Sequence, residues 1–372
     1  MNGTTNSEYI IPVGRVGDIR LNWPIAFYDV LSRFGGFDLI IGNPPYGDLL
    51  SEKQKLFVRG NSDSANEIAA VFVDRFVDLI SEGGILSYII TFAITFNKGL
   101  SSVRKKLRDN FETIKVYSFD RDKCRIFSTM TQSVSIMIAD NRRNNANGKF
   151  LTSRFLRTLP EDFNSISLEE ANNMLLLESG IGSDFSKSHR LPKLGERRVV
   201  DIISKLLRCN RMVENLLNIN EKKTIIYYRT SGNYWYNAWN WKPYESSEIK
   251  ALEVPESYAD FIIMLVNSSL FYFYLRIYGD GRHMNTDIFR SFPVPAEDKV
   301  SSRKKEIHDV VVELMRELQS NFDAKHKRFI TSKVKPVIDK CDKLLSEIYE
   351  LSPEDLEYII NYDSEIRSNE DV

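Results

Sequence analysis

Four consecutive residues, Asn43, Pro44, Pro45 and Tyr46, combine two hydrogen-bond acceptors with an aromatic ring. The Asn43 side chain offers an amide oxygen, and Pro44 offers a carbonyl oxygen that no local N–H is well placed to reach. Because Pro45 has no N–H and restricts the residue before it, the loop is rigid and extended. Two acceptors beside a stacking ring suit a planar base with an exocyclic amino group. The alternative is an ordinary strand-to-loop turn with a packed tyrosine.

A short apolar run precedes these four residues, with Phe37 followed by Leu39 to Ile41, and Gly42 ends it. No polar face alternates with the apolar one, which predicts a buried strand and favours a parallel one. The four residues then leave the carboxyl end of that strand. In open α/β sheets, this is the edge at which ligands bind.

The stretch from Gly35 to Tyr46 reads Gly-Gly-Phe-Asp-Leu-Ile-Ile-Gly-Asn-Pro-Pro-Tyr and resembles the catalytic motif of N6-adenine DNA methyltransferases. It is most similar to the gamma class, which includes TaqI-like enzymes and the methyltransferase part of type IIG restriction–modification proteins. The preceding segment, Asn22 to Phe27, resembles the lead-in of type IIG relatives.

The resemblance implies that the Asn43 side chain and the Pro44 carbonyl bind the adenine N6, and that Tyr46 stacks on a base flipped out of the duplex. It also implies S-adenosyl-L-methionine as the methyl donor. By position, Phe127 matches the residue that closes the base pocket from the other side, although it can equally be a core residue. Pro45 joins Phe127 as an expected substrate-binding residue.

The composition is that of an ordinary globular chain of 372 residues, long enough for two domains and a sizeable core. The net charge of −1 gives the whole chain no strong attraction for DNA. Three distant cysteines and four scattered histidines predict no metal site. No signal peptide is visible, and the longest apolar region, Gly84–Phe96, is too short to span a bilayer, so we expect a cytoplasmic protein without a membrane partner.

Beyond the motif, a helix is expected to begin at its cap, Asn66, with Glu67 in the first turn, and to end at Glu82–Gly84. A second buried strand, Ile85–Thr91, follows and completes a βαβ arrangement. One face of the helix is apolar, through Ile68, Val71, Phe72, Phe76, Leu79 and Ile80. Next come a basic helix and two strands, at Ser102–Phe111, Ile114–Phe119 and Ser133–Ala139.

Two stretches are strongly basic. Ser101–Pro160 holds 13 Lys and Arg against 5 Asp and Glu, and Lys187–Arg211 holds 8 against 2. In a nearly neutral chain this asymmetry suits a cleft that faces phosphates. Solvated surface charge is the equally weighted alternative.

The polar stretch Asn144–Gly148 follows what reads as the last core strand, and it is the best domain boundary. Aromatic residues between Tyr227 and Trp241 either stack on bases or form a small β core. A helix is expected over Tyr258–Tyr278, ending at Gly279, and the stretch from Asn267 to Pro293 resembles the target-recognition domain of the same family. The C-terminal part shows two helical apolar stripes and a helix start at Ser352-Pro353.

The predicted fold is α/β: the C-terminal part of a Rossmann-like methyltransferase sheet, followed by an α+β target-recognition domain and a helical tail. The predicted boundaries are 1–145 for an incomplete catalytic region, 146–298 for the recognition domain and 299–372 for the helical segment. The predicted function is site-specific methylation of adenine N6 in double-stranded DNA, within a restriction–modification system.

The pocket for S-adenosyl-L-methionine is expected to be incomplete. In the gamma class the cofactor-binding strands precede the catalytic motif, but only 42 residues precede Asn43 and none forms a glycine-rich turn after a strand. At about 30 residues per βαβ unit, those strands do not fit. We therefore expect a partner chain, or a longer protein, to supply the N-terminal half. The alternatives are a non-catalytic DNA-binding specificity subunit and an inactive gene fragment.

Overall fold

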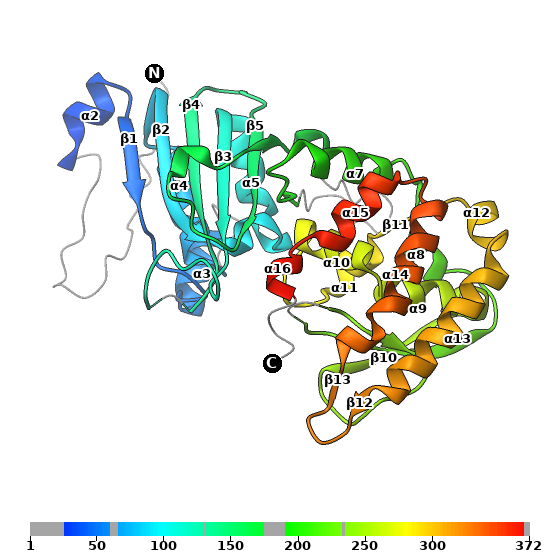
Figure 1. Ribbon diagram of the computed structural model, residues 1–372. Coiled ribbons are helices and arrows are strands. Elements are labelled where there is room, and N and C mark those ends of the chain that lie inside the picture. Colours follow the sequence, from blue (N-terminus) through cyan, green and yellow to red (C-terminus); the bar gives the residue numbers. More distant parts are fainter. Residues whose placement is uncertain (1–25, 60–65, 130, 175–189, 233–234, 368–372) are drawn as a thin grey trace. The chain divides into compact units, whose positions relative to one another are not determined.

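The computed structural model (Figure 1) describes residues 26–59, 66–129, 131–174, 190–232 and 235–367. They divide into two compact units. The first takes the described residues up to Ile94, then Gly99–Val116 and Val134–Leu151; the second takes Thr95–Lys98, Tyr117–Ser133 and the described residues from Thr152 onward. The sequence also predicts a short strand pair over Ile10–Arg20, and these residues lie outside the described part of the chain.

A mixed six-stranded sheet has the order β1-β2-β4-β3-β5-β6, with β1 parallel and β4 antiparallel to β2. The predicted mixed α/β class is therefore confirmed. The elements up to the end of this sheet are α2 Tyr28–Arg33, β1 Phe37–Gly42, α3 Glu52–Arg59, α4 Ile68–Val77, β2 Ile80–Thr91, η1 Phe92–Thr95, η2 Lys98–Leu100, α5 Ser101–Asn110, β3 Phe111–Phe119, β4 Val134–Arg142, β5 Lys149–Leu156, η3 Phe163–Ser165 and β6 Glu169–Glu170. The stretch 144–148 joins β4 to β5, so the sheet does not end before it as predicted.

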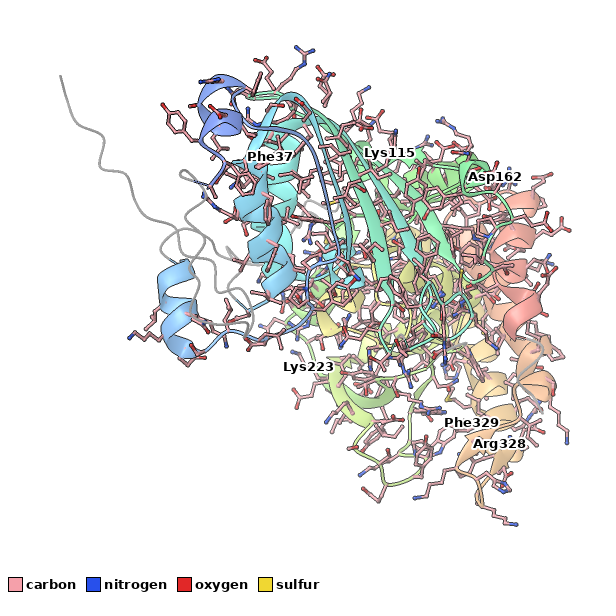
Figure 2. All side chains as sticks on the ribbon, turned by 90° about the vertical axis from the view of Figure 1, so that its left-hand side faces the viewer. Phe37, Lys115, Asp162, Lys223, Arg328 and Phe329 are labelled. Atoms are coloured by element: carbon pink, nitrogen blue, oxygen red, sulfur yellow. The ribbon has the colours of Figure 1, made fainter. Side chains whose placement is uncertain are left out.

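Strand β1 is an edge strand of this sheet and, among the described strands, pairs with β2 only. The parallel pairing is as predicted, with Leu39 opposite Ile85 and Gly42 opposite Tyr88. The predicted burial is wrong: Leu39 is 53% exposed and Ile41 is 73% exposed. Phe37, at the start of the strand (Figure 2), contacts the ring of Phe27 at a centroid distance of 5.2 Å. Beyond that contact, an edge strand has fewer neighbours to cover its apolar side chains.

Helix α4 differs from its prediction at both ends. Glu67, not Asn66, is its cap, and its side chain accepts the Ala69 N–H. The helix ends at Val77 because the residues after it join the sheet: the Phe37 N–H donates to the Leu79 carbonyl at 2.8 Å. Strand β2 therefore begins earlier than expected and contains both Gly83 and Gly84. The buried side of the helix is formed by Ile68, Ala69, Ala70, Val73 and Val77.

The second unit is rich in helices and carries three small sheets, ordered β10-β8-β9, β11-β7 and β12-β13. Its further elements are η4 Asn172–Met174, α7 Arg197–Leu207, β7 Arg211–Met212, α8 Val213–Leu217, β8 Lys223–Arg229, β9 Ala238–Trp239, β10 Ile249–Pro255, η5 Glu256–Tyr258, α9 Ala259–Val266, α10 Ser269–Tyr278, α11 Thr286–Arg290, β11 Pro293–Val294, α12 Glu297–Ser301, α13 Lys304–Ser320, β12 Phe322–Asp323, β13 Arg328–Phe329, α14 Thr331–Ile348, α15 Pro353–Asn361 and α16 Ser364–Arg367.

One helix was predicted where the structure has two, α9 and α10. Asn267 and Ser268 break the helix: the Ser268 hydroxyl accepts the Phe271 N–H and caps α10, while the Asn267 side chain donates to the Ala238 carbonyl at 2.8 Å. Local side-chain hydrogen bonds compete with the helix ladder in this way. No single helix in the described part of the chain is long and apolar enough to cross a membrane; α9, with η5, and α10 pass only as a pair bent by 74°.

The aromatic residues after β8 form a core. Trp235, Tyr236 and Trp239 are buried, and the Trp235 indole donates to the Asn267 carbonyl at 2.8 Å. The small-β-core alternative therefore describes these three residues, which leaves no exposed face on them for a base.

The C-terminal helices follow their predicted stripes. α13 and α14 pack against each other, and Ser352 caps α15 in a capping box with Asp355. Asp342 of α14 is almost fully buried, and its carboxylate accepts the Ser269 N–H at the start of α10 at 2.7 Å. Burial raises the pKa of Asp342 to about 6, although the Ser269 hydrogen bonds act in the opposite direction.

Candidate functional site

The loop that follows β1 is held by its own residues. The Tyr46 hydroxyl lies 2.7 Å from Asn43 Oδ1 and 3.1 Å from the carbonyl oxygen of Ile89 in β2. Pro44 is buried, whereas Asn43 and Pro45 are exposed. Burial, and then the nearby Glu67 carboxylate, raises the pKa of Tyr46, so its hydroxyl keeps its proton and acts as a donor. The hydroxyl thereby fixes the direction of the Asn43 amide oxygen.

A second clamp holds the end of this loop. The Gly47 N–H donates to Glu67 Oε1 at 2.8 Å, and the Ile68 N–H donates to the Gly47 carbonyl at 3.1 Å. Gly47 has a φ of +93°, a conformation that glycine adopts without strain. Glu67 thus joins the loop to the start of α4. The sequence prediction placed Glu67 only in the first turn, and its position just before an apolar helix was the signal for the cap.

These contacts define what the loop can do chemically. An amide oxygen accepts two hydrogen bonds, so Asn43 Oδ1 retains one acceptor position beside the bond from Tyr46. The Pro44 carbonyl is a second acceptor in the same rigid loop. Two fixed acceptors bind a donor with two hydrogens, which is the chemistry of an exocyclic amino group.

Phe127 belongs to the second unit and lies in the loop between β3 and β4. It is 39% exposed, which disfavours the alternative that it is simply a core residue. Its pairing with Tyr46 across a flipped base stays a prediction.

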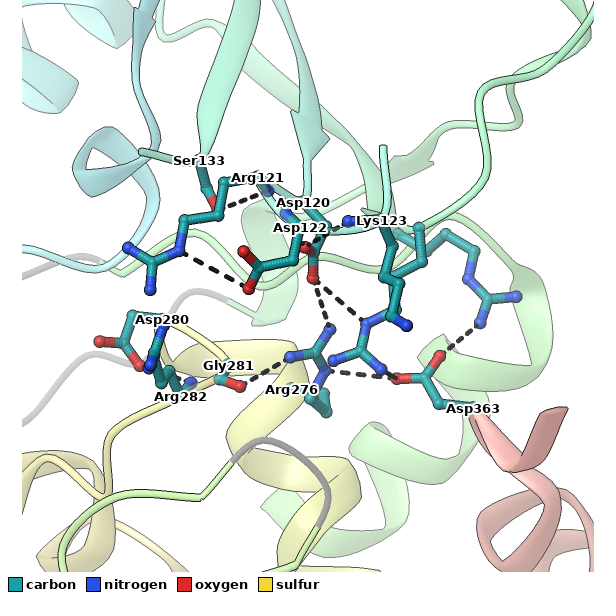
Figure 3. A network of polar contacts seen from close by, with 12 residues as sticks. Asp120, Arg121, Asp122, Lys123, Ser133, Arg276, Asp280, Gly281, Arg282 and Asp363 are labelled. Atoms are coloured by element: carbon teal, nitrogen blue, oxygen red, sulfur yellow. Dashed lines mark hydrogen bonds and ion pairs between the residues drawn. The ribbon is translucent and has the colours of Figure 1, made fainter. Parts of the chain in front are cut away.

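The loop of Phe127 is anchored by a buried carboxylate that the sequence did not single out. Asp120 Oδ1 accepts the N–H groups of Asp122 at 2.7 Å and Lys123 at 3.2 Å. Asp120 Oδ2 faces Arg157 and Arg276. Figure 3 shows its pair with Arg276. No local pattern could have revealed these partners, because they come from distant parts of the chain.

The two basic stretches are only partly available to phosphates. Arg104, Arg190 and Lys193 are buried and donate to backbone carbonyls; the Lys193 ammonium lies 2.8 Å from the Gly279 carbonyl oxygen. Burial lowers the pKa of Lys193 well below its usual value. The exposed cations nearest to Phe127 in sequence are Lys123 and Arg125. The local charge excess is therefore structural in part, which the residue count could not show.

Within the described residues no three His, Cys, Asp or Glu side chains are placed to hold a metal ion. No described strand is followed by a Gly-x-Gly turn, so the described residues lack the glycine-rich turn that holds a nucleotide-type cofactor.

Residues 14–127 match the model of the Eco57I restriction-modification methylase family. A protein of Methanocaldococcus jannaschii, assigned as a type II restriction enzyme and methyltransferase, is 27% identical over 179 residues, which are 48% of this chain but 14% of that protein. The sequence matches support a restriction–modification methyltransferase. The chain spans only a small part of the length of this relative.

Two solved structures are similar at lower identity. The type IIL restriction-modification enzyme MmeI, in complex with DNA, shares 11% identity at a TM-score of 0.47, over 89% of this chain and 57% of its own. The type IIG restriction endonuclease BpuSI shares 10% identity at a TM-score of 0.32, over 86% of this chain and 54% of its own. Both TM-scores lie below 0.5, so these likenesses carry no argument here.

Proposed function

We propose that the chain is the catalytic and DNA-recognition part of a site-specific adenine-N6 DNA methyltransferase in a restriction–modification system. One observation carries this proposal: the loop at the carboxyl end of a parallel strand holds Asn43 Oδ1 through the Tyr46 hydroxyl, and Pro44 is the next residue of that loop. Adenine carries the exocyclic amino group that this pair of acceptors fits, and the match to restriction–modification methylases supports DNA as the substrate.

In the proposed reaction, the residues of this chain orient and polarise the amino group. Two hydrogen bonds from the adenine N6 to Asn43 and Pro44 turn its lone pair away from the ring and leave it directed at the incoming methyl carbon. Positive charge that develops on N6 is stabilised by the same two oxygens, which are already in place before reaction. A sulfonium donor would lose its S–CH3 bond and leave as a neutral thioether, while N6 exchanges one N–H for N–CH3 and releases one proton. No general base is required before attack.

S-adenosyl-L-methionine is the proposed donor, but the described residues do not fit it, because they include no glycine-rich turn after a strand. The donor is therefore proposed to be held by a partner chain or by another part of a longer protein. The exposed Leu39 and Ile41 on β1 support this idea, since parallel strands are normally covered on both faces.

The main test is Asn43→Ala, expressed from the native locus so that any partner is present. Asn43 is exposed in the free chain and would be covered by the bound base; loss of the acceptor in that complex costs about 1–3 kcal/mol, or roughly 5- to 150-fold, and more if the amino group turns away. Single-molecule sequencing of genomic DNA should show N6-methyladenine at one sequence with the wild-type chain and none with the variant. Purified Asn43→Ala should keep its DNA affinity, because affinity rests mainly on phosphate contacts.

An unchanged N6-methyladenine pattern in Asn43→Ala would exclude this assignment. Absence of the mark from wild-type cells would favour a non-catalytic specificity subunit or an inactive fragment. Calorimetry adds a second test: the purified chain alone should bind S-adenosyl-L-methionine poorly, and micromolar binding would show that the cofactor pocket is complete within this chain.

A further inference from the structure

A buried ion network surrounds the base of the loop that carries Phe127. Arg276 of α10 is 1% exposed and lies between two carboxylates (Figure 3). Its Nη2 is 4.0 Å from Asp120 Oδ2, and its Nε is 3.3 Å from Asp363 Oδ2. Its Nη1 donates to the Gly281 carbonyl at 2.8 Å. One guanidinium therefore contacts the Phe127 loop, the C-terminal region and the turn after α10.

Arg157 makes a second bridge between the same two carboxylates. Its Nε is 3.3 Å from Asp120 Oδ2 and its Nη1 is 3.7 Å from Asp363 Oδ2. Asp363 also pairs with Arg154 at 3.2 Å and accepts the Tyr272 hydroxyl at 3.1 Å. Three arginines thus share two buried carboxylates, so neither acid can be removed without leaving positive charge unbalanced in the interior.

Asp363 is held in its ionised form by these neighbours. Burial would raise its pKa, but Arg276, Arg157 and Arg154 lower it below the usual value for an aspartate. The charged carboxylate is therefore the working form of the network at neutral pH.

The loop side of the network is built on the backbone. Asp120 Oδ1 accepts two loop N–H groups, the Cys124 N–H donates to the Asp120 carbonyl at 3.0 Å, and the Arg121 N–H donates to the Ser133 hydroxyl at 3.2 Å. A change in the direction of the Asp120 carboxylate therefore moves the backbone just before Phe127. An aromatic side chain that stacks on a flipped base needs such a fixed support, because flipping is itself unfavourable.

We propose that Arg276 and Asp363 are positioning residues for the Phe127 loop, and that they tie this loop to the turn Asp280–Met284 after α10. The proposal rests on the proposed function and on the expectation from the sequence that Phe127 closes the pocket of the flipped adenine. The turn is ordered by Asp280, whose Oδ1 accepts the N–H groups of Arg282 and His283 at 2.8 and 2.7 Å. DNA contacts at that turn and the position of Phe127 are then coupled through one buried arginine.

The test is hydrogen exchange, read by mass spectrometry, on the full chain and its Asp363→Asn variant. Asp363 pairs with Arg154, Arg157 and Arg276, and the exchange of residues 121–129 should rise at least tenfold in the variant. The matched control is Glu347→Gln, which removes the exposed partner of Arg303 in the same unit and should leave residues 121–129 unchanged. Asp363→Glu, which keeps the charge, should restore protection. Increased exchange confined to the contacts of Asp363, with residues 121–129 unchanged, would overturn the proposal.

Where Asp363→Asn does not fold, Asp120→Asn decides the matter, since asparagine still accepts the loop N–H groups but removes the charge facing Arg276. The same tenfold rise in residues 121–129 is expected, and no rise overturns the proposal. Binding to duplex with 2-aminopurine at the target position gives the functional readout: Asp363→Asn should lower the fluorescence change at least fivefold at equal DNA affinity. An exchange result as expected, together with unaltered methylation in Asn43→Ala, would leave the network standing and refute the proposed function.

Discussion

The two loops expected to hold a base are stabilised in opposite ways. The loop of Tyr46 is tied by short contacts within the first unit, from Asn43 to Tyr46 and from Gly47 to Glu67. The loop of Phe127 is held by buried charges that lie far from it in the sequence. Two arginines that pair with Asp120 of the loop also pair with Asp363, near the end of the chain. The first loop therefore depends on its own sequence, whereas the second depends on a fold that must already be complete.

This difference decides how each loop responds to mutation. A change near the first loop acts through one hydrogen bond, with a cost of about 1 kcal/mol. A change in the second unit leaves buried charge unpaired, which costs about 3–5 kcal/mol when one partner is lost. Damage to the second loop can therefore originate far from it in the sequence.

The largest effect is expected from Tyr46→Ala combined with Phe127→Ala. Each ring contributes about 1–3 kcal/mol of stacking, roughly 5- to 150-fold in the flipping equilibrium. The fluorescence change of 2-aminopurine at the target position should disappear in the double variant and fall in each single variant. Tyr28→Ala, which removes an exposed ring elsewhere in the first unit, is the control. An identical signal from the double variant would mean that the two loops do not act together.

A smaller effect is expected at the buried carboxylate Asp342. It tests whether a buried ionisable group of the second unit makes the stability of the protein depend on pH. Its folded pKa of about 6 lies above the unfolded value, so the folded state binds the proton more tightly. The contribution of Asp342 to stability is therefore largest below its unfolded pKa and falls as pH rises through 4 to 6, by about 3 kcal/mol at most. Asp342→Asn should remove this slope and be more stable than wild type at pH 7.

Urea unfolding at pH 5 and pH 7 measures this slope. Glu347→Gln on the same helix, whose partner is Arg303, serves as the control and should keep the wild-type slope. An unchanged slope in Asp342→Asn would assign the pH response to other groups. Asp363 acts in the opposite direction, since its pKa is lowered: its contribution is lost only as pH falls below the unfolded value of an aspartate.

The smallest effect is expected at Glu67. Glu67→Ala removes both the cap of α4 and the acceptor for the Gly47 N–H, and should cost about 1 kcal/mol. Glu67→Gln keeps an acceptor oxygen and should cost less. Hydrogen exchange at residues 43–50 should rise in the alanine variant while residues 121–129 stay protected. A rise at both loops would break the distinction between local and long-range support.

Much of the first loop could be predicted because the residues that determine its conformation are adjacent in sequence. The apolar run before Gly42 indicated a parallel strand, and two prolines indicated an extended loop. The burial of β1 could not be predicted, because it depends on what covers Leu39 and Ile41 and not on their own types. The cap at Glu67 was missed by one residue, since Asn66 is the better cap by residue type.

The second unit was harder to predict because its structure depends on contacts between residues that are far apart in the sequence. The apolar stripes of α13 and α14 and the cap at Ser352 were visible, as periodicity and caps are local. The break between α9 and α10 was not, because it depends on Asn267 reaching the carbonyl of Ala238. Arg276 is one cation on an apolar helix, and only the fold shows that Asp120 and Asp363 converge on it.

The turn after α10 also sets a rule for redesign of the protein. Gly281 has a φ of +74°, and a Cβ at this position would collide with the Arg276 guanidinium. Even alanine there would push Arg276 off its carboxylates. Anyone grafting a new loop between α10 and α11 can thus vary exposed residues, such as Arg282 and His283, but has to retain glycine at 281. The replaceable segment therefore begins at residue 282, because residue 281 must have no Cβ.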